Sequence, residues 1–226
     1  MNSNIKLTFA LLAGLNLLSS CDNGKTSTEK GKSDSAVVND MKYDSMNKMN
    51  PGEMMKMDNG LMISMQTMMG KMDKMKMSGD FDLDFATMMI EHHQGAIEMS
   101  NIELSKGTDE KMKTLAQQII AEQTKEIDVL TDIIKNYKLS GMKHGEGTLE
   151  KINAAMNTNM SDMKMSDNTD KDYAMLMIEH HESAVKMFTA QLNNGMNDKL
   201  KQLAKKGITD QTKEIAEFKA WAANNK

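Results

Sequence analysis

Apolar residues recur at helical spacing between the stretch "DFDLD" and Gly107. At about 100° per residue, one arc of a helix through this stretch collects the apolar side chains, among them Phe85 and Met99. Glu91 and Glu98 fall outside the arc and are predicted to point outward. Glycine commonly follows the last turn of a helix. The pattern therefore predicts one amphipathic helix that ends before Gly107.

The same periodicity continues beyond Gly107 and predicts a second helix over residues 109–137. A matching pair of helices is predicted over 172–193 and 197–223. Methionine-rich stretches at 53–76 and 149–164 precede the two pairs and are predicted to be helical too. The inward positions of the second helix are Met112, Leu115, Ala116, Ile119, Ile120, Ile127, Leu130 and Ile134.

The chain contains an internal duplication. Residues 61–127 align without a gap with residues 149–215, at an offset of 149 − 61 = 88 positions, and "QTKEI" recurs whole at the end of each copy. Two copies are too few for a solenoid. Two antiparallel helical hairpins packed about a pseudo-twofold axis make a four-helix bundle, so the sequence predicts an all-α fold.

The N-terminal segment has the features of an export signal. Lys6 is followed by an apolar run at residues 7–18, which is shorter than a membrane-spanning helix requires. The run ends in "LSSC", which resembles a bacterial lipobox, so residues 1–21 are interpreted as a lipoprotein signal with Cys21 as the lipidated residue. An ordinary secretory signal with a chance cysteine is the alternative.

Composition limits the remaining chain to a few classes. Residues 22–52 are polar and predict a flexible tether, and 53–226 form the duplicated helical domain. The full chain carries a net charge of −4 and no arginine. Removing the signal also removes Lys6 and leaves 27 − 32 = −5. A mildly acidic protein of this kind is a poor partner for nucleic acid.

Four of the five histidines occur as adjacent pairs in the duplicated motif "MIEHH". They are His92 and His93 in the first copy and His180 and His181 in the second. All four fall within the predicted apolar arcs. Each imidazole brings two nitrogens that need partners when buried. The pattern favours a metal site, and a purely structural hydrogen-bond network is the alternative.

Methionines accompany these histidines on the same helix faces. Met89 precedes His93 by four residues and Met177 precedes His181 by four, so each pair presents a thioether beside an imidazole. The first copy adds Met88 one turn before His92, although the second copy has leucine there. The remaining candidate ligands on these stripes are Met99 and Met187.

The repeated "QTKEI" offers residues that could orient the imidazoles. A carboxylate or amide beside a ligating imidazole fixes the ring tautomer. Gln123 and Gln211 fall inside the apolar arc, whereas Glu126 and Glu214 fall at its edge. An exposed helix surface with chance charge pairs is the alternative, and it applies more to the two glutamates than to the glutamines.

Thioether and imidazole donors together suit copper, above all Cu(I). Structural zinc usually recruits thiolates, and lipidation would occupy the single cysteine, so zinc is less expected. The chain has 27 methionines. Those at residues 54–77 are predicted to capture extra Cu(I) on a mobile stretch, because several lie among charged residues. Met142 and His144 form one more exposed candidate pair.

The doubled "MIEHH" motif with its downstream "LA" and "EI" resembles the bacterial secreted family known as domain of unknown function 305. The resemblance covers residues 68–221 and carries the family's motif histidines onto His92, His93, His180 and His181. It implies a ferritin-like bundle with two helices per repeat. It also supports copper, because some members are periplasmic copper-binding proteins linked to copper tolerance.

The resulting hypothesis is an envelope lipoprotein, facing the periplasm or the exterior, that sequesters copper or hands it to a copper-delivery protein. One alternative is a ferritin-like di-metal oxidoreductase, which would bind iron. Such enzymes use Glu-x-x-His on two helices, whereas Glu91 and Glu179 directly precede histidines here and are predicted to face outward. The other alternative is a metal-free interaction module. No nucleophile–base pair or phosphate-binding loop favours an enzyme.

Overall fold

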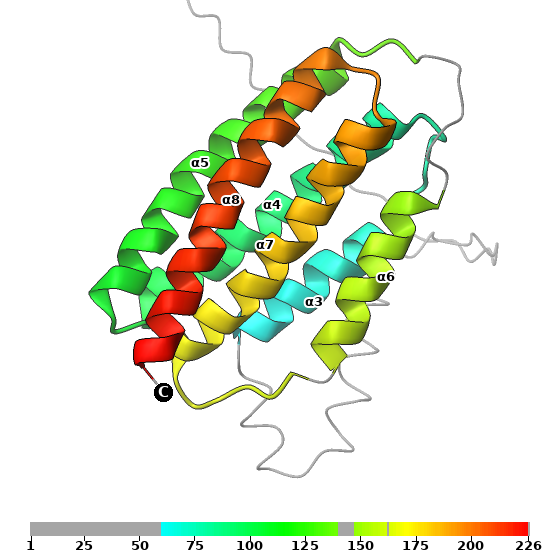
Figure 1. Cartoon of the computed structure of the whole chain (residues 1–226). Coiled ribbons are helices and arrows are strands. Elements are labelled where there is room, and N and C mark those ends of the chain that lie inside the picture. The colour runs from blue at the N-terminus through cyan, green and yellow to red at the C-terminus, as the bar shows by residue number, and fades with distance from the viewer. Residues whose placement is uncertain (1–59, 140–146, 162, 226) are drawn as a thin grey trace, which may run out of the picture. The chain divides into compact units, whose positions relative to one another are not determined.

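The computed structural model describes residues 60–139, 147–161 and 163–225, and in these ranges it contains six helices and no strand. The predicted all-α fold is confirmed. The predicted signal, Cys21, the tether, and the pair Met142 and His144 lie outside the described residues. The helices, labelled in Figure 1, are α3 (Gly60–Asp73), α4 (Phe81–Lys106), α5 (Glu110–Lys135), α6 (Thr148–Ser161), α7 (Thr169–Asn194) and α8 (Asp198–Asn224).

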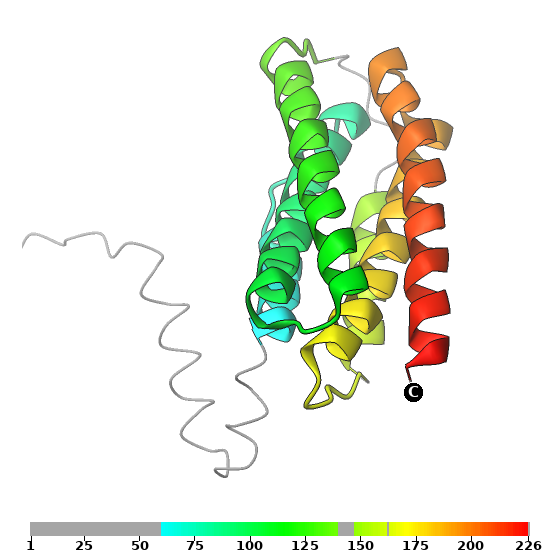
Figure 2. The ribbon, with the colours of Figure 1, turned by 90° about the vertical axis from the view of Figure 1, so that its left-hand side faces the viewer.

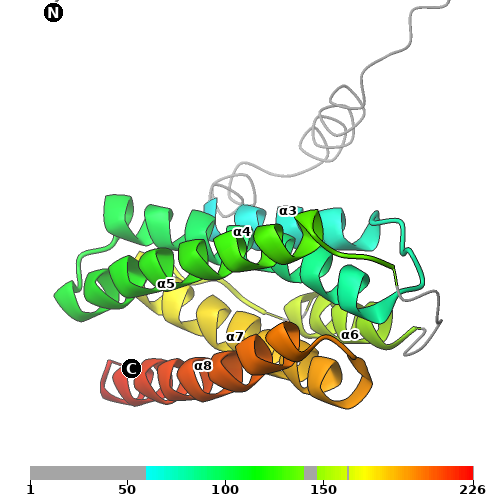
Figure 3. The same cartoon turned by 90° about the horizontal axis from the view of Figure 1, so that it is seen from above.

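The duplication organises these helices. Helices α6, α7 and α8 each begin 88 residues after α3, α4 and α5, as 148 − 60, 169 − 81 and 198 − 110 show. Helix α4 pairs with α5 and α7 pairs with α8, and the two hairpins meet through α4 and α7. Figures 2 and 3 show the first copy on one side and the second copy on the other. In the described part of the chain, no helix is long and apolar enough to span a membrane.

Each long helix begins at an aspartate or asparagine whose side chain accepts a hydrogen bond from the first turn. Asp80 caps α4 and Asn168 caps α7, while Asp109 and Asn197 cap α5 and α8. These residues satisfy backbone N–H groups that have no partner within the helix. Gly79, directly before the first cap, has a φ of 83°, a conformation that favours glycine. Local sequence therefore fixes where the helices start.

Helix α3 packs beside Glu91 of α4, which the sequence predicted to face solvent, whereas Glu98 is exposed as predicted. Lys71 of α3 lies 3.4 Å from a carboxylate oxygen of Glu91, and Glu91 is half-buried. A Cβ atom at Gly95 would lie 2.6 Å from the sulfur of Met68, so glycine permits this close packing. Glu179 is half-buried as well. The outward prediction for both glutamates was wrong, because a single helical wheel takes no account of a third helix.

The described part of the methionine-rich segment is packed rather than mobile. Four methionines of α3 belong to the hydrophobic core, and Met72 among them is only 1% exposed. Met75 and Met77 are half-buried against that core. The expectation that these thioethers sit on a mobile stretch was wrong, and a chain beginning at Gly79 would lose part of its core. The other buried methionines of α3 are Met65, Met68 and Met69.

The two hairpins are joined by reciprocal carboxylate contacts. Asp82 of α4 accepts hydrogen bonds from the backbone N–H groups of Met196 and Asn197, in the loop before α8. Asp170 of α7 accepts from the backbone of Thr108 and Asp109, in the loop before α5. The residues of the second contact occupy positions equivalent to those of the first in the duplication. Each copy therefore supplies the carboxylate that binds the loop of the other.

The two contacts differ in one buried neighbour. Gln191 donates its amide to Asp82 at 2.6 Å. Its counterpart in the first copy, 191 − 88 = 103, is Glu103, which is fully buried beside Asp170. Burial, and then the hydrogen bond with Asp170, raise the pKa of Glu103 to about 8. Glu103 therefore keeps its proton at neutral pH and takes the place of the amide.

This difference predicts a pH dependence of stability. The folded protein holds a proton on Glu103 that the unfolded chain releases above a pH of about 4.3. The contribution of this proton to the free energy of unfolding is complete below that pH and is lost as the pH rises through about 8. Glu103→Gln should remove this dependence and raise the free energy of unfolding at pH 8 by about 1–3 kcal/mol. Urea unfolding at pH 5, 7 and 9 measures it.

The second copy provides the matched control for this prediction. Gln191→Glu places a carboxyl against Asp82, as Glu103 stands against Asp170. It should introduce an additional loss of stability between pH 5 and pH 9. Equal pH slopes in the wild-type protein and in Glu103→Gln would contradict the assignment of the proton to Glu103.

Candidate metal centre

The four motif histidines meet where α4 and α7 cross. All four are 0% exposed, which confirms that they point inward. The ring centroids of His92 and His180 are 3.8 Å apart. His93 lies 6.4 Å from His92, and His181 lies 5.7 Å from His180. The duplication thus brings the imidazoles into one continuous group in the core.

The outer two imidazoles are each held by a carboxylate of their own hairpin. His93 Nε2 lies 2.9 Å from Glu126 Oε2, and His181 Nε2 lies 2.7 Å from Glu214 Oε2. Burial would raise the pKa of Glu126, but the hydrogen bond with His93 and the nearby Lys206 outweigh it and hold that pKa below its ordinary value. An ionised carboxylate only accepts, so Nε2 of His93 carries the proton.

The inner two imidazoles are held differently. His180 Nε2 donates to the backbone oxygen of His92 at 2.8 Å, because a carbonyl oxygen can only accept. Both nitrogens of His92 are buried without a hydrogen-bond partner. Burial, and then the neighbouring imidazoles, lower the pKa of His92 and His180 well below the ordinary value. Both rings are therefore neutral at physiological pH.

The other ring nitrogen is the chemically informative one. Nδ1 of His92, His93, His180 and His181 is buried without a hydrogen-bond partner. A neutral imidazole that donates from Nε2 presents a lone pair at Nδ1. His180 has this arrangement, and His93 and His181 have it in their neutral forms. Buried lone pairs without donors are costly, and carboxylate-held imidazoles of this kind are the usual form of metal-ligating histidine.

The predicted thioether ligands lie in the same core. Met88 is 1% exposed, and Met89, Met99, Met177 and Met187 are 0% exposed. They belong to the hydrophobic cluster that surrounds the imidazoles. Among residues 60–139, 147–161 and 163–225, no group of three or more His, Cys, Asp or Glu side chains is arranged to hold a metal ion. Imidazole and thioether are the donors that this core offers.

The structure reverses the expected roles of the "QTKEI" residues. Glu126 and Glu214 bind the histidines, although the sequence favoured the glutamines. Gln123 and Gln211 are buried, at 3% exposure each, but in the described part of the chain neither bonds to a histidine. Glu126 and Glu214 stand three residues further along their helices, and their carboxylates contact the rings directly.

Near the imidazoles, the two copies differ at one pair of positions, and both members of the pair change together. Phe85 packs against Phe188 with ring centroids 6.0 Å apart. At the equivalent positions, Tyr173 and Ser100 form a buried hydrogen bond of 2.9 Å. Sequence reasoning missed this pair. The signal was present in the alignment, where Phe85 matches Tyr173 and Ser100 matches Phe188, so both partners change together.

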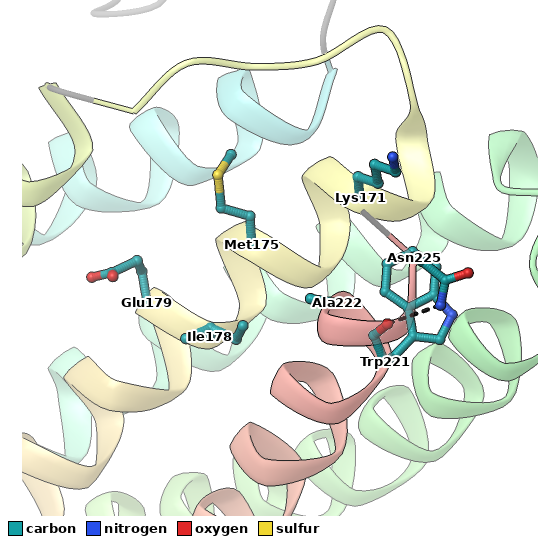
Figure 4. Close-up of a pocket in the computed structure, with 7 residues that line it drawn as sticks. All are labelled: Lys171, Met175, Ile178, Glu179, Trp221, Ala222 and Asn225. Atoms are coloured by element: carbon teal, nitrogen blue, oxygen red, sulfur yellow. Dashed lines mark hydrogen bonds between the residues drawn. The ribbon is translucent and has the colours of Figure 1, made fainter.

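A surface pocket of about 360 Å³ lies apart from this centre, between the start of α7 and the end of α8. Figure 4 shows side chains from both helices, with Met175 on α7 and Trp221 and Asn225 at the end of α8. Glu179, which precedes His180, also lines it. None of the candidate metal ligands is among the lining residues, so the pocket is not part of the metal centre.

The fold and the centre define a class of all-α proteins built from duplicated helical hairpins around buried imidazoles. A model of the family described as "Domain of unknown function (DUF305)" matches residues 22–134 and 82–222. The chain belongs to this family, which confirms the resemblance seen in its motifs. No curated protein matches the chain.

Two solved structures illustrate the relationship. CopM in its Cu(II)-bound form is 30% identical, with a TM-score of 0.50 over 64% of this chain and 97% of that chain. A DUF305 protein from Streptomyces coelicolor, described as secreted, is 24% identical, with a TM-score of 0.54 over 66% of this chain and 95% of that chain. The second likeness supports the fold alone.

Proposed function

We propose that this protein binds copper at the α4–α7 crossing and sequesters it or passes it on. The observation that carries the proposal is the set of buried, unpartnered Nδ1 atoms on four imidazoles enclosed by methionines. Three of these rings are anchored through Nε2, to Glu126, to Glu214 and to a backbone oxygen. The similarity to CopM, solved in a Cu(II)-bound form, supports copper.

Ligand chemistry favours Cu(I) over the other candidates. Thioether sulfur is a soft donor that needs no deprotonation, and imidazole suits copper as well. Zinc in structural sites is usually held by thiolates, and the chain has one cysteine, at its predicted lipidation site. Iron in ferritin-like enzymes is held by Glu-x-x-His motifs, whereas here Glu91 and Glu179 are adjacent to the histidines. Iron and zinc are therefore the less favoured metals.

Anaerobic loading with Cu(I), followed by desalting and metal analysis, tests the proposal. At least one tightly bound copper ion per chain is expected, and zinc in equal excess should not displace it. If the protein retains no copper, the metal-free interaction module becomes the better-supported hypothesis. Peroxide or oxygen turnover by the iron-loaded protein, without copper retention, would instead favour a di-metal oxidoreductase.

We further propose that lipid on Cys21 anchors the domain to the cell envelope, facing the periplasm or the exterior, where a copper-delivery protein would be its partner. The support is the apolar run at residues 7–18 that ends in "LSSC". Two or more acyl chains hold a protein stably on a membrane. Cys21→Ser should therefore give soluble protein or uncleaved precursor, measured by membrane fractionation. Unchanged membrane association would contradict lipidation at Cys21.

A further inference from the structure

Helices α5 and α8 bear four carboxylates at duplicated positions, on the side of the bundle where the histidine-bound glutamates emerge. Glu122 and Glu126 of α5 correspond to Asp210 and Glu214 of α8, as 122 + 88 and 126 + 88 show. Lys206 of α8 reaches across to Glu126, with Nζ 3.4 Å from Oε1, and also binds Asp210 at 2.5 Å. These four carboxylates are called the acidic seam.

The seam carboxylates lie within each other's electric field. Partial burial raises the pKa of Glu122, and the next cause is the negative charge of Glu214 on the opposite helix. Asp210 and Glu126 act in the same direction, while Lys206 opposes them. Helices α5 and α8 make few close contacts with each other. The direct geometric link is Lys206, which contacts Glu126 of α5 and Asp210 of α8 and so joins the carboxylates of the two helices.

Polar groups continue from the seam toward the imidazoles with increasing burial. Glu122 is exposed, whereas the side chains of Glu126 and Glu214 are 12% and 13% exposed. Gln123 and Gln211 of the same two helices are each 3% exposed. The two glutamates then contact His93 and His181, which have no exposure at all. In both copies, exposure therefore falls from the outer carboxylates, Glu122 and Asp210, through Glu126 and Glu214 to the histidines that these glutamates bind.

A second, independent feature of this path indicates a ligand. Both amide atoms of Gln123 are buried without a hydrogen-bond partner, and so is the amide oxygen of Gln211. Buried amides are normally satisfied, and each exception needs a physical reason. An amide oxygen is a neutral donor to a cation. These amide oxygens and the Nδ1 atoms of the four histidines are all buried electron-pair donors that have no hydrogen-bond partner among the described residues.

We propose that the acidic seam is the route by which a monovalent metal cation reaches the buried histidines, with Lys206 as its counter-ion in the metal-free protein. The proposal rests on the copper-binding function proposed above. A cluster of carboxylates raises the local concentration of cations and their association rate. The Lys206 ammonium neutralises part of this field and must move aside as the metal passes Glu126.

The test separates the rate of copper uptake from the amount bound. Cu(I), supplied anaerobically as its acetonitrile complex, which is a monocation, is mixed rapidly with the full-length protein. An excess of strong chelator stops the reaction, and protein-bound copper is measured. Glu122→Gln with Asp210→Asn should slow association by about 3- to 10-fold at low ionic strength. The final copper content should be unchanged, because neither residue touches an imidazole.

A variant of equal charge provides the control. Glu98→Gln with Asp128→Asn also removes two negative charges, from exposed positions outside the seam. It should leave the association rate within about twofold of wild type at the same low ionic strength, because neither carboxylate belongs to the acidic seam that is proposed to concentrate the cation. Lys206→Gln should accelerate uptake. Raising the salt concentration should narrow all of these differences.

The outcomes distinguish the two proposals. Slower uptake in the seam variant alone, with full final occupancy, supports the route. Equal rates in the seam variant and wild type, or an equal slowing in the control, would overturn the route while leaving copper binding intact. Wild-type protein that takes up no copper would overturn the copper-binding function and the route with it.

Discussion

Alanine at both His93 and His181 should abolish most of the copper-induced rise in Tm. A ligand that binds only the folded state adds about 2.7 kcal/mol of stability when its free concentration is 100 times Kd. Removing both side chains removes two Nδ1 lone pairs and leaves Glu126 and Glu214 without the imidazoles that they bind. Thermal unfolding followed by circular dichroism, with and without Cu(I), measures the shift.

Two further variants keep this experiment decisive if the alanine variant folds poorly. Met89→Leu with Met177→Leu keeps the volume of the core and removes two thioethers one turn from His93 and His181. It should reduce the copper-induced shift while the metal-free Tm changes little. Replacing Glu98 and Lys186, both exposed, should change neither value. A full shift in the double histidine variant would show that the paired histidines are structural.

Much of the fold could be predicted from the sequence because its signals are local or repeated. The end of the first predicted helix follows from the glycine at 107, and helix faces follow from a period of 3.6 residues. The gap-free duplication implied two equivalent hairpins. The inward position of the histidines required only the wheel of a single helix, and all four are buried as predicted.

Contacts between helices could not be predicted from the pattern of a single helix. The half-buried state of Glu91 depends on α3, which packs on α4 through Gly95 and Met68. A helical wheel that assumes only two layers of helices assigns such positions to the solvent-exposed face. The packed state of Met72 escaped prediction for the same reason, because its neighbours in sequence are charged while its neighbours in space are apolar. Which helix covers which face is decided by tertiary packing.

The helical wheel also could not predict whether glutamine or glutamate is the hydrogen-bond partner of the histidines. The wheel correctly placed Gln123 deeper than Glu126. Depth alone did not identify the hydrogen-bond partner, because the carboxylate of Glu126, which starts at the edge of the arc, contacts His93. A long side chain acts at a distance from its own backbone position, and a helical wheel records only the direction in which that side chain starts.

Substituting Asp82 or Asp170 by alanine should destabilise the fold more than any surface change. Asp82 accepts from the backbone of Met196 and Asn197 and from the Gln191 amide. Each buried donor left without a partner costs about 1–3 kcal/mol, so either single variant should lose about 3–5 kcal/mol. Urea unfolding measures this loss, with exposed Asp128→Ala as the matched control.

The double variant should be close to unfolded. The two carboxylates stand at the starts of α4 and α7, at opposite ends of the bundle in Figure 1, so their costs should add. Their sum is comparable with the total stability of about 5–15 kcal/mol that is usual for a domain. Each carboxylate joins one hairpin to the loop of the other, so losing both should separate α4 from α7 and dismantle the imidazole group between them. A double variant that keeps cooperative unfolding and its copper-induced shift would show that the α4–α7 core alone holds the hairpins together.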